Sequence, residues 1–147
     1  MAHILFIEDD LEDDPEESTT FLLLHEKGYM VTPARTGKEA IDKLHSTAFD
    51  LILLDIMLPP GLLEEDDETN LSEVKRLDMG LHMLNLLRSG AFEPTGTSAD
   101  VPVVVVSAVP GVDRWDKIRE LTGNERRCLS KPCEPEEIIE TVAEALL

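Results

Sequence analysis

The amino-acid sequence predicts an α/β fold in which five parallel strands form a doubly wound sheet, with helices on both of its faces. Short apolar runs of strand length alternate with helix patterns along the whole chain, which is typical of this class. The run Val101–Val106 is apolar on both faces, as a strand buried inside a parallel sheet is. The length of 147 residues suits a single domain, 1–147, with a core of its own.

The first predicted strand is the apolar run His3–Ile7, and a helix follows it. Asp14 is suited to cap this helix because Pro15 stands at the first helical position and acids fill the first turn. The helix carries the apolar residues 21–24, and we expect it to stop at Gly28.

A second helix begins after a short predicted strand, Tyr29–Thr32. Its start is a capping box, in which Thr36 caps the helix and Glu39 reaches back to the preceding backbone. The apolar residues of this helix share one face and are Ala40, Ile41 and Leu44.

The remaining elements continue the alternation of strands and helices. They are a strand Asp50–Leu54, a helix Met79–Arg88, a strand Val101–Val106, a helix Asp113–Leu121, a strand Arg127–Leu129 and a last helix opened by Pro135. The last helix presents one apolar stripe, made of Ile138, Ile139, Val142 and Leu146.

Two connections are longer than a minimal fold needs. Residues 60–77 form an insertion between the third strand and the third helix, where about 2–6 residues are usual. Five consecutive acids, Glu64–Glu68, stand near its start, and one helical turn is predicted over Ser72–Leu77. Residues 93–100 form a shorter polar loop.

The charge of the chain is strongly unbalanced, with 31 acids against 13 bases and a formal net charge of −18. Such a surface opposes direct attraction to nucleic acid or to an anionic membrane. No apolar run approaches the ~20 residues that cross a membrane, and the start of the chain lacks the basic region of a signal peptide. We therefore expect a cytoplasmic protein. The two cysteines and four histidines show no spacing typical of a disulfide framework or a zinc site.

Polar residues follow the predicted strands at the point where each strand ends. They are Glu8, Asp9 and Asp10 after the first strand, Asp55 after the third, Ser107 after the fourth and Lys131 after the fifth. In open parallel sheets, ligands bind outside the carboxyl ends of the strands. We therefore expect a carboxylate cluster, a hydroxyl group and an ammonium group to converge there.

This arrangement resembles the receiver domains of two-component response regulators, the family of the chemotaxis regulator. The segments ILFIEDD, DLILLDIMLP, PVVVVSA and LSKP occur in the order of the family and cover nearly the whole chain apart from the insertion. The resemblance implies the flavodoxin-like strand order 2-1-3-4-5, with the site between strands one and three. It implies a signalling phosphoprotein and not an enzyme. Since nothing follows the fifth helix, we expect no output domain.

The resemblance also implies a role for each matching residue. Asp55 would be the phosphoacceptor, which takes a phosphoryl group from a phosphohistidine on a sensor histidine kinase or a phosphotransfer protein. Asp9, Asp55 and the carbonyl oxygen of Met57 would bind Mg²⁺ directly, and Glu8 would bind it through a water molecule. The phosphorylated form would signal through contacts with a downstream protein.

Two further residues complete the implied site. Lys131 would place its charge on a phosphoryl oxygen, and Ser107 would move inward to donate a hydrogen bond. In this family, the residues two positions beyond the acceptor and beyond the hydroxyl tune hydrolysis. Here these residues are Met57 and Val109, neither of which can orient a water molecule by a side-chain hydrogen bond.

The sequence departs from the family pattern in three places. The position three before Lys131 is usually aromatic and here is Cys128, which predicts a different readout of phosphorylation. The first loop is longer than usual, which leaves the pair Asp9 and Asp10 as an alternative to Glu8 and Asp9 for the metal roles. The insertion crosses the mouth of the site, which the family normally leaves open.

Three other functions fit parts of the pattern. A receiver-like scaffold that binds a partner without phosphorylation is favoured by Cys128 but opposed by the intact acidic group. An aspartyl-phosphate hydrolase of the haloacid dehalogenase type needs a second Asp two residues after the nucleophile, where Met57 stands. A flavodoxin-like cofactor binder needs a phosphate-cradling loop after the first strand, where acids stand instead.

Bases gather in one stretch of this acidic chain. Six of the 13 are Arg114, Lys117, Arg119, Arg126, Arg127 and Lys131. We expect this stretch either to balance the acidic last helix or to meet a partner with an acidic docking patch.

Overall fold

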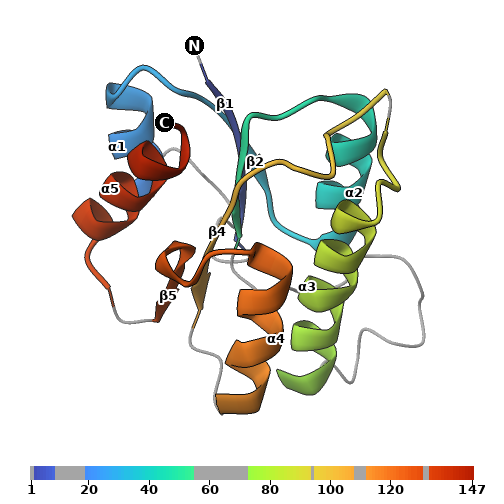
Figure 1. The fold of residues 1–147 in the computed structure, drawn as a ribbon. Helices are drawn as coiled ribbons and strands as arrows, with labels where there is room; N and C mark the ends of the chain where they lie inside the picture. The colour runs from blue at the N-terminus through green and yellow to red at the C-terminus, as the bar shows by residue number, and fades with distance from the viewer. Residues whose placement is uncertain (1, 9–18, 55–72, 94, 108–111, 131–132) are drawn as a thin grey trace.

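The computed structural model describes residues 2–8, 19–54, 73–93, 95–107, 112–130 and 133–147 (Figure 1). Within these residues, five strands alternate with five α-helices, as the sequence predicts. The strands are β1 His3–Ile7, β2 Met30–Ala34, β3 Leu51–Leu54, β4 Val103–Ser107 and β5 Cys128–Ser130. The helices are α1 Thr19–Glu26, α2 Gly37–Ser46, α3 Glu73–Arg88, α4 Val112–Thr122 and α5 Pro135–Ala145.

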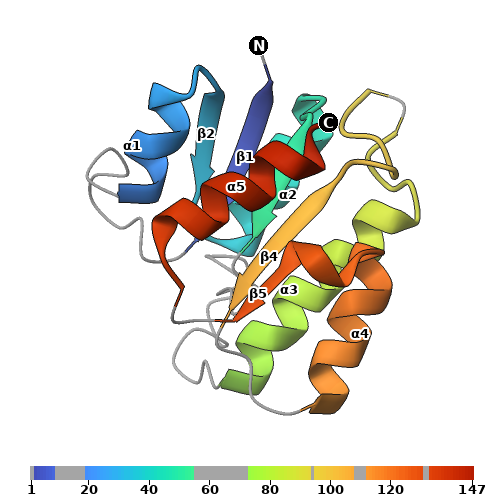
Figure 2. The ribbon, with the colours of Figure 1, turned by 60° about the vertical axis from the view of Figure 1, so that its left-hand side comes forward.

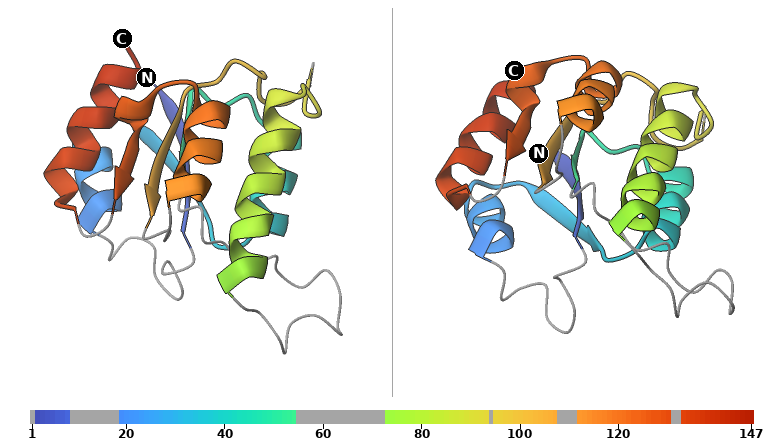
Figure 3. Two further views of the ribbon diagram at one scale, coloured as in Figure 1. Left: turned by 60° about the horizontal axis from the view of Figure 1, so that its bottom comes forward. Right: turned by 90° about the horizontal axis from the view of Figure 1, so that it is seen from below.

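The strands form one sheet in the order β2-β1-β3-β4-β5, and neighbouring strands are parallel in every pair. This order confirms the predicted doubly wound, flavodoxin-like topology. Helices α1 and α5 cover one face of the sheet, whereas α2, α3 and α4 cover the other (Figures 1 and 3). Figure 2 shows α5 lying across the sheet on the side nearer the viewer. The carboxyl ends of the strands consequently lie at one edge of the sheet.

Each layer of helices buries a separate apolar core against the sheet. Successive residues of a strand face opposite sides, so Leu5 and Ile7 pack with α2, α3 and α4, while Ile4 and Phe6 pack with α1 and α5. Every residue of β3 is at most 1 % exposed. Burial on both faces explains why this strand is a continuous apolar run and does not alternate with polar residues.

Helices α2 and α5 begin where the sequence predicts. The backbone N–H of Glu39 donates to Thr36 Oγ1 at 3.2 Å, and Glu39 Oε2 accepts from the backbone N–H of Arg35 at 2.8 Å. Pro135 is the first residue of α5, whose Ile138, Ile139 and Val142 are buried. The cap by Thr36 and the last apolar stripe are therefore confirmed, whereas the reciprocal bond of the capping box is shifted, because Glu39 accepts from Arg35 and not from the N-cap Thr36.

Helix α3 begins at Glu73, and the predicted start at Met79 is wrong. Residues 73–77 of the predicted insertion are therefore helical, which includes most of the single turn expected there. The early start was missed because Glu73–Asp78 contains few apolar residues, so the helical periodicity is weak there although helix-forming residues are common. Residues 60–72, like the predicted helix start at Asp14, lie outside the described residues.

Strand β2 is Met30–Ala34, one to two residues later than predicted, and it includes Pro33. The backbone N–H of Met30 donates toward the β1 side, to Ala2 O at 2.9 Å, and Ala34 O accepts from that side. Alternate positions face β1, so Pro33 faces the outer edge, where its missing N–H breaks no ladder. Strands β4 and β5 are also shifted from their predicted starts, and a short 3₁₀ helix, Glu125–Arg127, precedes β5.

The polar loop predicted ahead of β4 is packed against the amino edge of the sheet, where the strands begin. Thr97 is fully buried, donates its hydroxyl to Thr47 O at 2.6 Å and accepts from the backbone N–H of Phe49 at 3.1 Å. A Cβ atom at Gly96 would clash with the carbonyl oxygen of Leu44 in α2, so only glycine fits there. The loop therefore ties the end of α2 to the start of β3.

Candidate functional site

The carboxyl ends of β1, β3, β4 and β5 form one edge of the sheet, here called the carboxyl edge. The register relates these ends residue by residue. Ile7 pairs with Leu54, Leu54 with Val105, and Val105 with Cys128, so one row of residues crosses four strands. Since a parallel strand advances about 3.3 Å per residue, the described residues one or two positions beyond this row lie at the carboxyl edge.

Glu8 lies one position beyond this row, directly after β1. Its backbone N–H donates to Ala34 O at 3.0 Å, which extends the β1–β2 ladder by one bond. The residue is half-buried. The backbone therefore holds Glu8 in line with β1 at the carboxyl edge, as predicted.

Ser107 lies two positions beyond the row, as the last residue of β4. It pairs with Ser130, the last residue of β5. The sequence predicted that Ser107 follows β4, whereas the structure includes it in the strand. Its backbone position is therefore set by the ladder with β5 and not by a loop.

Asp9, Asp55, Met57 and Lys131 lie outside the described residues. Their sequence neighbours do not, because Glu8 precedes Asp9, Leu54 precedes Asp55 and Ser130 precedes Lys131. The described strands β1, β3 and β5 thus lead directly to these predicted site residues at one common edge.

A divalent cation at this edge would need oxygen ligands from β1 and β3. Among the described residues, no group of three or more His, Cys, Asp or Glu could hold a metal ion. Glu8 is the one predicted ligand that lies among them. The other predicted ligands, Asp9, Asp55 and the carbonyl of Met57, lie outside the described residues. All four would offer hard oxygen donors, the type that Mg²⁺ prefers, and the pairing of Ile7 with Leu54 makes β1 and β3 neighbours, so the predicted residue types fit Mg²⁺.

The two cysteines lie against opposite faces of the sheet. Cys128 packs with the core under α2, α3 and α4, whereas Cys133 packs with the core under α1 and α5. In β5, a half-buried Cys128 thus occupies the position that is usually aromatic in the family that the sequence resembles.

The basic stretch that the sequence predicts is partly exposed. Lys117, Arg119 and Arg126 are exposed, and Arg119 pairs with Asp116 at 3.0 Å on α4. An exposed ion pair of this kind contributes little to stability, about 0–1 kcal/mol. These bases are therefore placed to face solvent or a partner.

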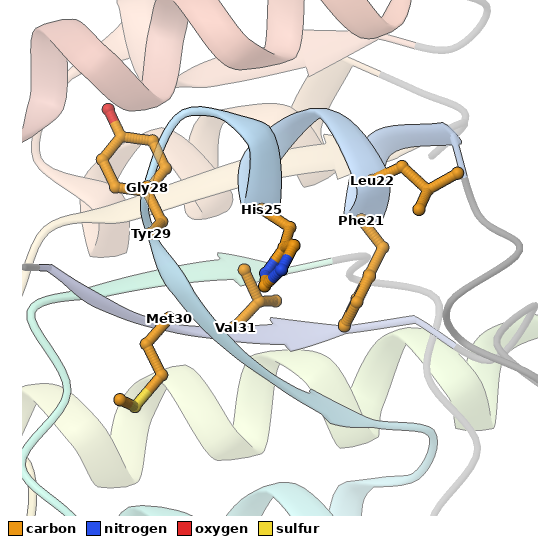
Figure 4. A pocket seen from close by; sticks show the side chains of 7 residues that line it. All are labelled: Phe21, Leu22, His25, Gly28, Tyr29, Met30 and Val31. Carbon is orange, nitrogen blue, oxygen red and sulfur yellow. The ribbon is translucent and has the colours of Figure 1, made fainter.

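An apolar hollow lies between α1 and β2, away from the carboxyl-edge site, and has a volume of about 530 Å³ (Figure 4). Its lining residues are Phe21, Leu22, His25, Gly28, Tyr29, Met30 and Val31. Leu22 and Met30 are 48 % and 53 % exposed. The signal for this feature is the run of four apolar residues at 21–24, since consecutive positions of a helix cannot all face the core. None of the described helices is both long and apolar enough to cross a membrane.

No model of a known protein family matches the chain. The chain is 29 % identical over 145 residues to the transcriptional regulatory protein YkoG of Bacillus subtilis (strain 168), with 99 % of this chain and 51 % of YkoG covered. It is 27 % identical over 136 residues to the phosphate regulon transcriptional regulatory protein PhoB of Klebsiella pneumoniae, with 92 % of this chain and 48 % of PhoB covered. The chain thus spans about half the length of these curated relatives.

Solved structures share the fold over nearly all of the chain. One is the CheY-like response regulator receiver domain protein of Methanospirillum hungatei JF-1, with a TM-score of 0.67 and 22 % identity, which covers 99 % of this chain and 94 % of that chain. The same five-stranded topology therefore accounts for nearly the full length of both.

Proposed function

We propose that the chain, which has the fold of CheY-like receiver domains and is similar in sequence to PhoB, is a receiver domain of two-component signalling and a switch that accepts a phosphoryl group on Asp55. The observation that carries the proposal is the row Ile7–Leu54–Val105–Cys128, which aligns the ends of four strands. Beyond that row, the chain continues with acids, a hydroxyl and an ammonium group, which is the set that phosphoryl transfer to a carboxylate needs.

In the proposed reaction, a carboxylate oxygen of Asp55 attacks the phosphorus of a phosphohistidine on the donor. The new P–O bond forms as the P–N bond breaks, and the imidazole nitrogen keeps the electron pair. Bound Mg²⁺ neutralises charge on the transferring phosphoryl group. Asp9, Asp55 and the carbonyl of Met57 would hold the ion directly, and Glu8 would hold it through a water molecule.

Two residues carry the consequence of phosphorylation into the sheet. Lys131 places its charge on a phosphoryl oxygen. Ser107 donates its hydroxyl to another, and this contact draws in the end of β4. Because Ser107 belongs to the ladder with β5, any shift of its backbone also acts on β5.

The partners follow from this chemistry. The donor is a sensor histidine kinase or a phosphotransfer protein, and the output is contact with a downstream protein. The relatives YkoG and PhoB are named as transcriptional regulatory proteins, but the net charge of −18 in this chain opposes direct binding of nucleic acid. We assign residues 1–147 to one receiver domain.

The test is phosphorylation by acetyl phosphate in the presence of Mg²⁺. Intact mass should increase by one acid-labile phosphoryl group in the wild type and not in Asp55→Asn or without Mg²⁺. Equal labelling of Asp55→Asn would show that the acceptor is another residue. A wild type that stays unlabelled, by acetyl phosphate and by a panel of phosphorylated kinases, would favour the alternative of a phosphorylation-independent scaffold, for which Cys128 is the supporting feature.

A further inference from the structure

Arg88, the last residue of α3, places its guanidinium group between two other segments of the chain. Nε donates to Leu121 O at 2.7 Å and Nη2 donates to Thr122 O at 3.4 Å. Nη1 donates to both Ala99 O and Val101 O at 2.7 Å. One side chain thus bonds four backbone carbonyls.

These carbonyls belong to the two sides of one β–α unit, β4 with the residues before it and α4. Leu121 and Thr122 end α4, while Ala99 and Val101 lead into β4. Strand β4 and helix α4 are consecutive in the chain, so residues 108–111 join the end of β4 to the start of α4. The two elements match in length, because the five residues of β4 and the eleven of α4 each span about 16 Å. Arg88 therefore cross-links the unit at its other end, at the amino edge.

A guanidinium group is suited to this position. The last carbonyls of a helix have no partner within the helix, and the negative end of the helix dipole favours a cation. The planar guanidinium group of arginine bonds carbonyls on both sides of the β–α unit at once, which the single ammonium group of lysine cannot do. Gly123, with φ +85°, ends the helix directly after these carbonyls.

The role of Arg88 is not limited to packing. Arg88 is half-buried, and burial lowers the pKa of its guanidinium group, while Asp100 raises that pKa and Arg127 lowers it. In the described part of the chain, all hydrogen bonds of this group go to neutral carbonyls and none to a carboxylate. Apolar side chains would fill the same space without desolvating a charge. The geometry is that of a device that fixes one segment relative to another.

We propose that Arg88 is a positioning residue that fixes the amino-edge end of α4, so that α4 turns about this end when the carboxyl edge is phosphorylated. The turning rests on the proposed function, whereas the fixed end rests on the contacts of Arg88. A shift of Ser107 passes through the next few residues to the first turn of α4, while the last turn stays on the sheet. The exposed bases of α4 then point in a new direction, while the helix stays packed on the core beneath it.

Hydrogen exchange measured by mass spectrometry on the full chain tests this proposal. We compare wild type and Arg88→Met, each with and without acetyl phosphate and Mg²⁺, and follow peptides from the first half of α4 (112–117) and the last (118–123). In the wild type, phosphorylation should change exchange in the first half and leave the last half protected. In Arg88→Met, exchange of the last half should be at least about tenfold faster before phosphorylation and should change further upon it.

Two variants control for charge and for folding. Arg88→Lys keeps the charge and loses the planar guanidinium group, and its exchange in the last half should lie between wild type and Arg88→Met. Arg119→Met removes an exposed arginine from α4 itself and should keep the wild-type pattern. If Arg88→Met proves unfolded by circular dichroism, Arg88→Lys and the wild type decide the question.

Each outcome separates this inference from the proposed function. Loss of protection in both halves of wild-type α4 upon phosphorylation overturns the fixed end, as does a wild-type pattern in both Arg88 variants. Absence of phosphorylation in every sample overturns the proposed function and with it the turning. In that case, exchange of the last half in the unphosphorylated variants still decides whether Arg88 fixes it.

Discussion

The two edges of the sheet use polar groups in different ways. At the amino edge, polar side chains bond the backbone: Asp50 accepts from the N–H of His3 at 2.8 Å, Thr97 joins Thr47 and Phe49, and Arg88 bonds four carbonyls. At the carboxyl edge, acids, a hydroxyl and a lysine follow successive strands in the sequence. One edge stabilises the fold, and the proposed function assigns the chemistry to the other.

This difference between the two edges indicates which substitutions should affect stability and which should affect function. Like carboxylates held close together repel each other when ionised, so the proposed cluster at the carboxyl edge should destabilise the protein until a cation binds. Satisfied buried hydrogen bonds stabilise it at the other edge. Changes at the amino edge should therefore reduce stability and spare phosphorylation, and changes at the carboxyl edge should do the reverse.

The largest effect on stability is expected from Gly96→Ala at the amino edge. A Cβ atom there meets the backbone carbonyls of Leu44, His45 and Phe92, which cannot all move aside. We expect the free energy of unfolding in urea to fall by about 3 kcal/mol, while the folded fraction still takes up one phosphoryl group. Gly28→Ala is the matched control, because its φ of +91° is strained but its Cβ meets nothing within 4 Å, and it should lose about 1 kcal/mol. Equal losses in both variants would contradict the tight packing of the loop.

Binding of Mg²⁺ should have the next largest effect. At a concentration ten times its Kd, the ion should stabilise the native state by about 1.4 kcal/mol, and the melting temperature should rise accordingly. Asp9→Asn should abolish this rise, while Asp50→Asn, a carboxylate of the amino edge, should keep it. If Asp9→Asn melts with the same dependence on Mg²⁺ as the wild type, the metal binds elsewhere.

Met57 should govern how long the phosphorylated state lasts. Hydrolysis needs a water molecule lined up on the phosphoryl group, and methionine offers no strong hydrogen bond to orient it. Met57→Asn should shorten the lifetime several-fold, or by about 1 kcal/mol in activation free energy, as measured by loss of the phosphorylated mass after removal of the donor. Met57→Leu should leave the lifetime unchanged. An unchanged or longer lifetime in Met57→Asn would refute this account.

The smallest effect is expected at the basic stretch of α4 and the segment before β5. Reversal of charge at Arg114 and Lys117 should slow association with the downstream partner by roughly twofold to fivefold, and more so at low salt. Reversal at Lys38, an exposed base on α2, provides the control and should have no such effect. If association is indifferent to Arg114, Lys117 and ionic strength, the docking surface lies elsewhere on the chain.

The sequence indicates candidate residues at the carboxyl edge but not the polar contacts of the amino edge, for a physical reason. A strand that leads into Glu8 or Asp55 is visible as an apolar run followed by an acid, because both signals are local. Thr97 and Arg88 give no such signal, since their partners are carbonyl groups distant in the sequence or in other elements. A buried threonine and a half-buried arginine read as loop and surface residues until the fold brings their acceptors together.

The same limit applies to the helix boundaries and to the hollow. The start of α3 depends on helix propensity alone over Glu73–Asp78, where no apolar face marks the helix. The hollow between α1 and β2 forms because neighbouring apolar residues of α1 point in different directions, and the sequence does not show which of them the sheet covers.

The outward-facing proline of β2 has a consequence for how this protein behaves when it is concentrated. Met30 is exposed on this edge strand, and an exposed apolar edge ordinarily invites a second chain to extend the sheet into a fibre. Within Met30–Ala34, the outward-facing backbone positions are Val31 and Pro33, so a ladder started at Val31 loses its next N–H. Self-association at this edge is therefore expected to proceed through side chains. Such clusters dissolve on dilution, in contrast to amyloid-like deposits.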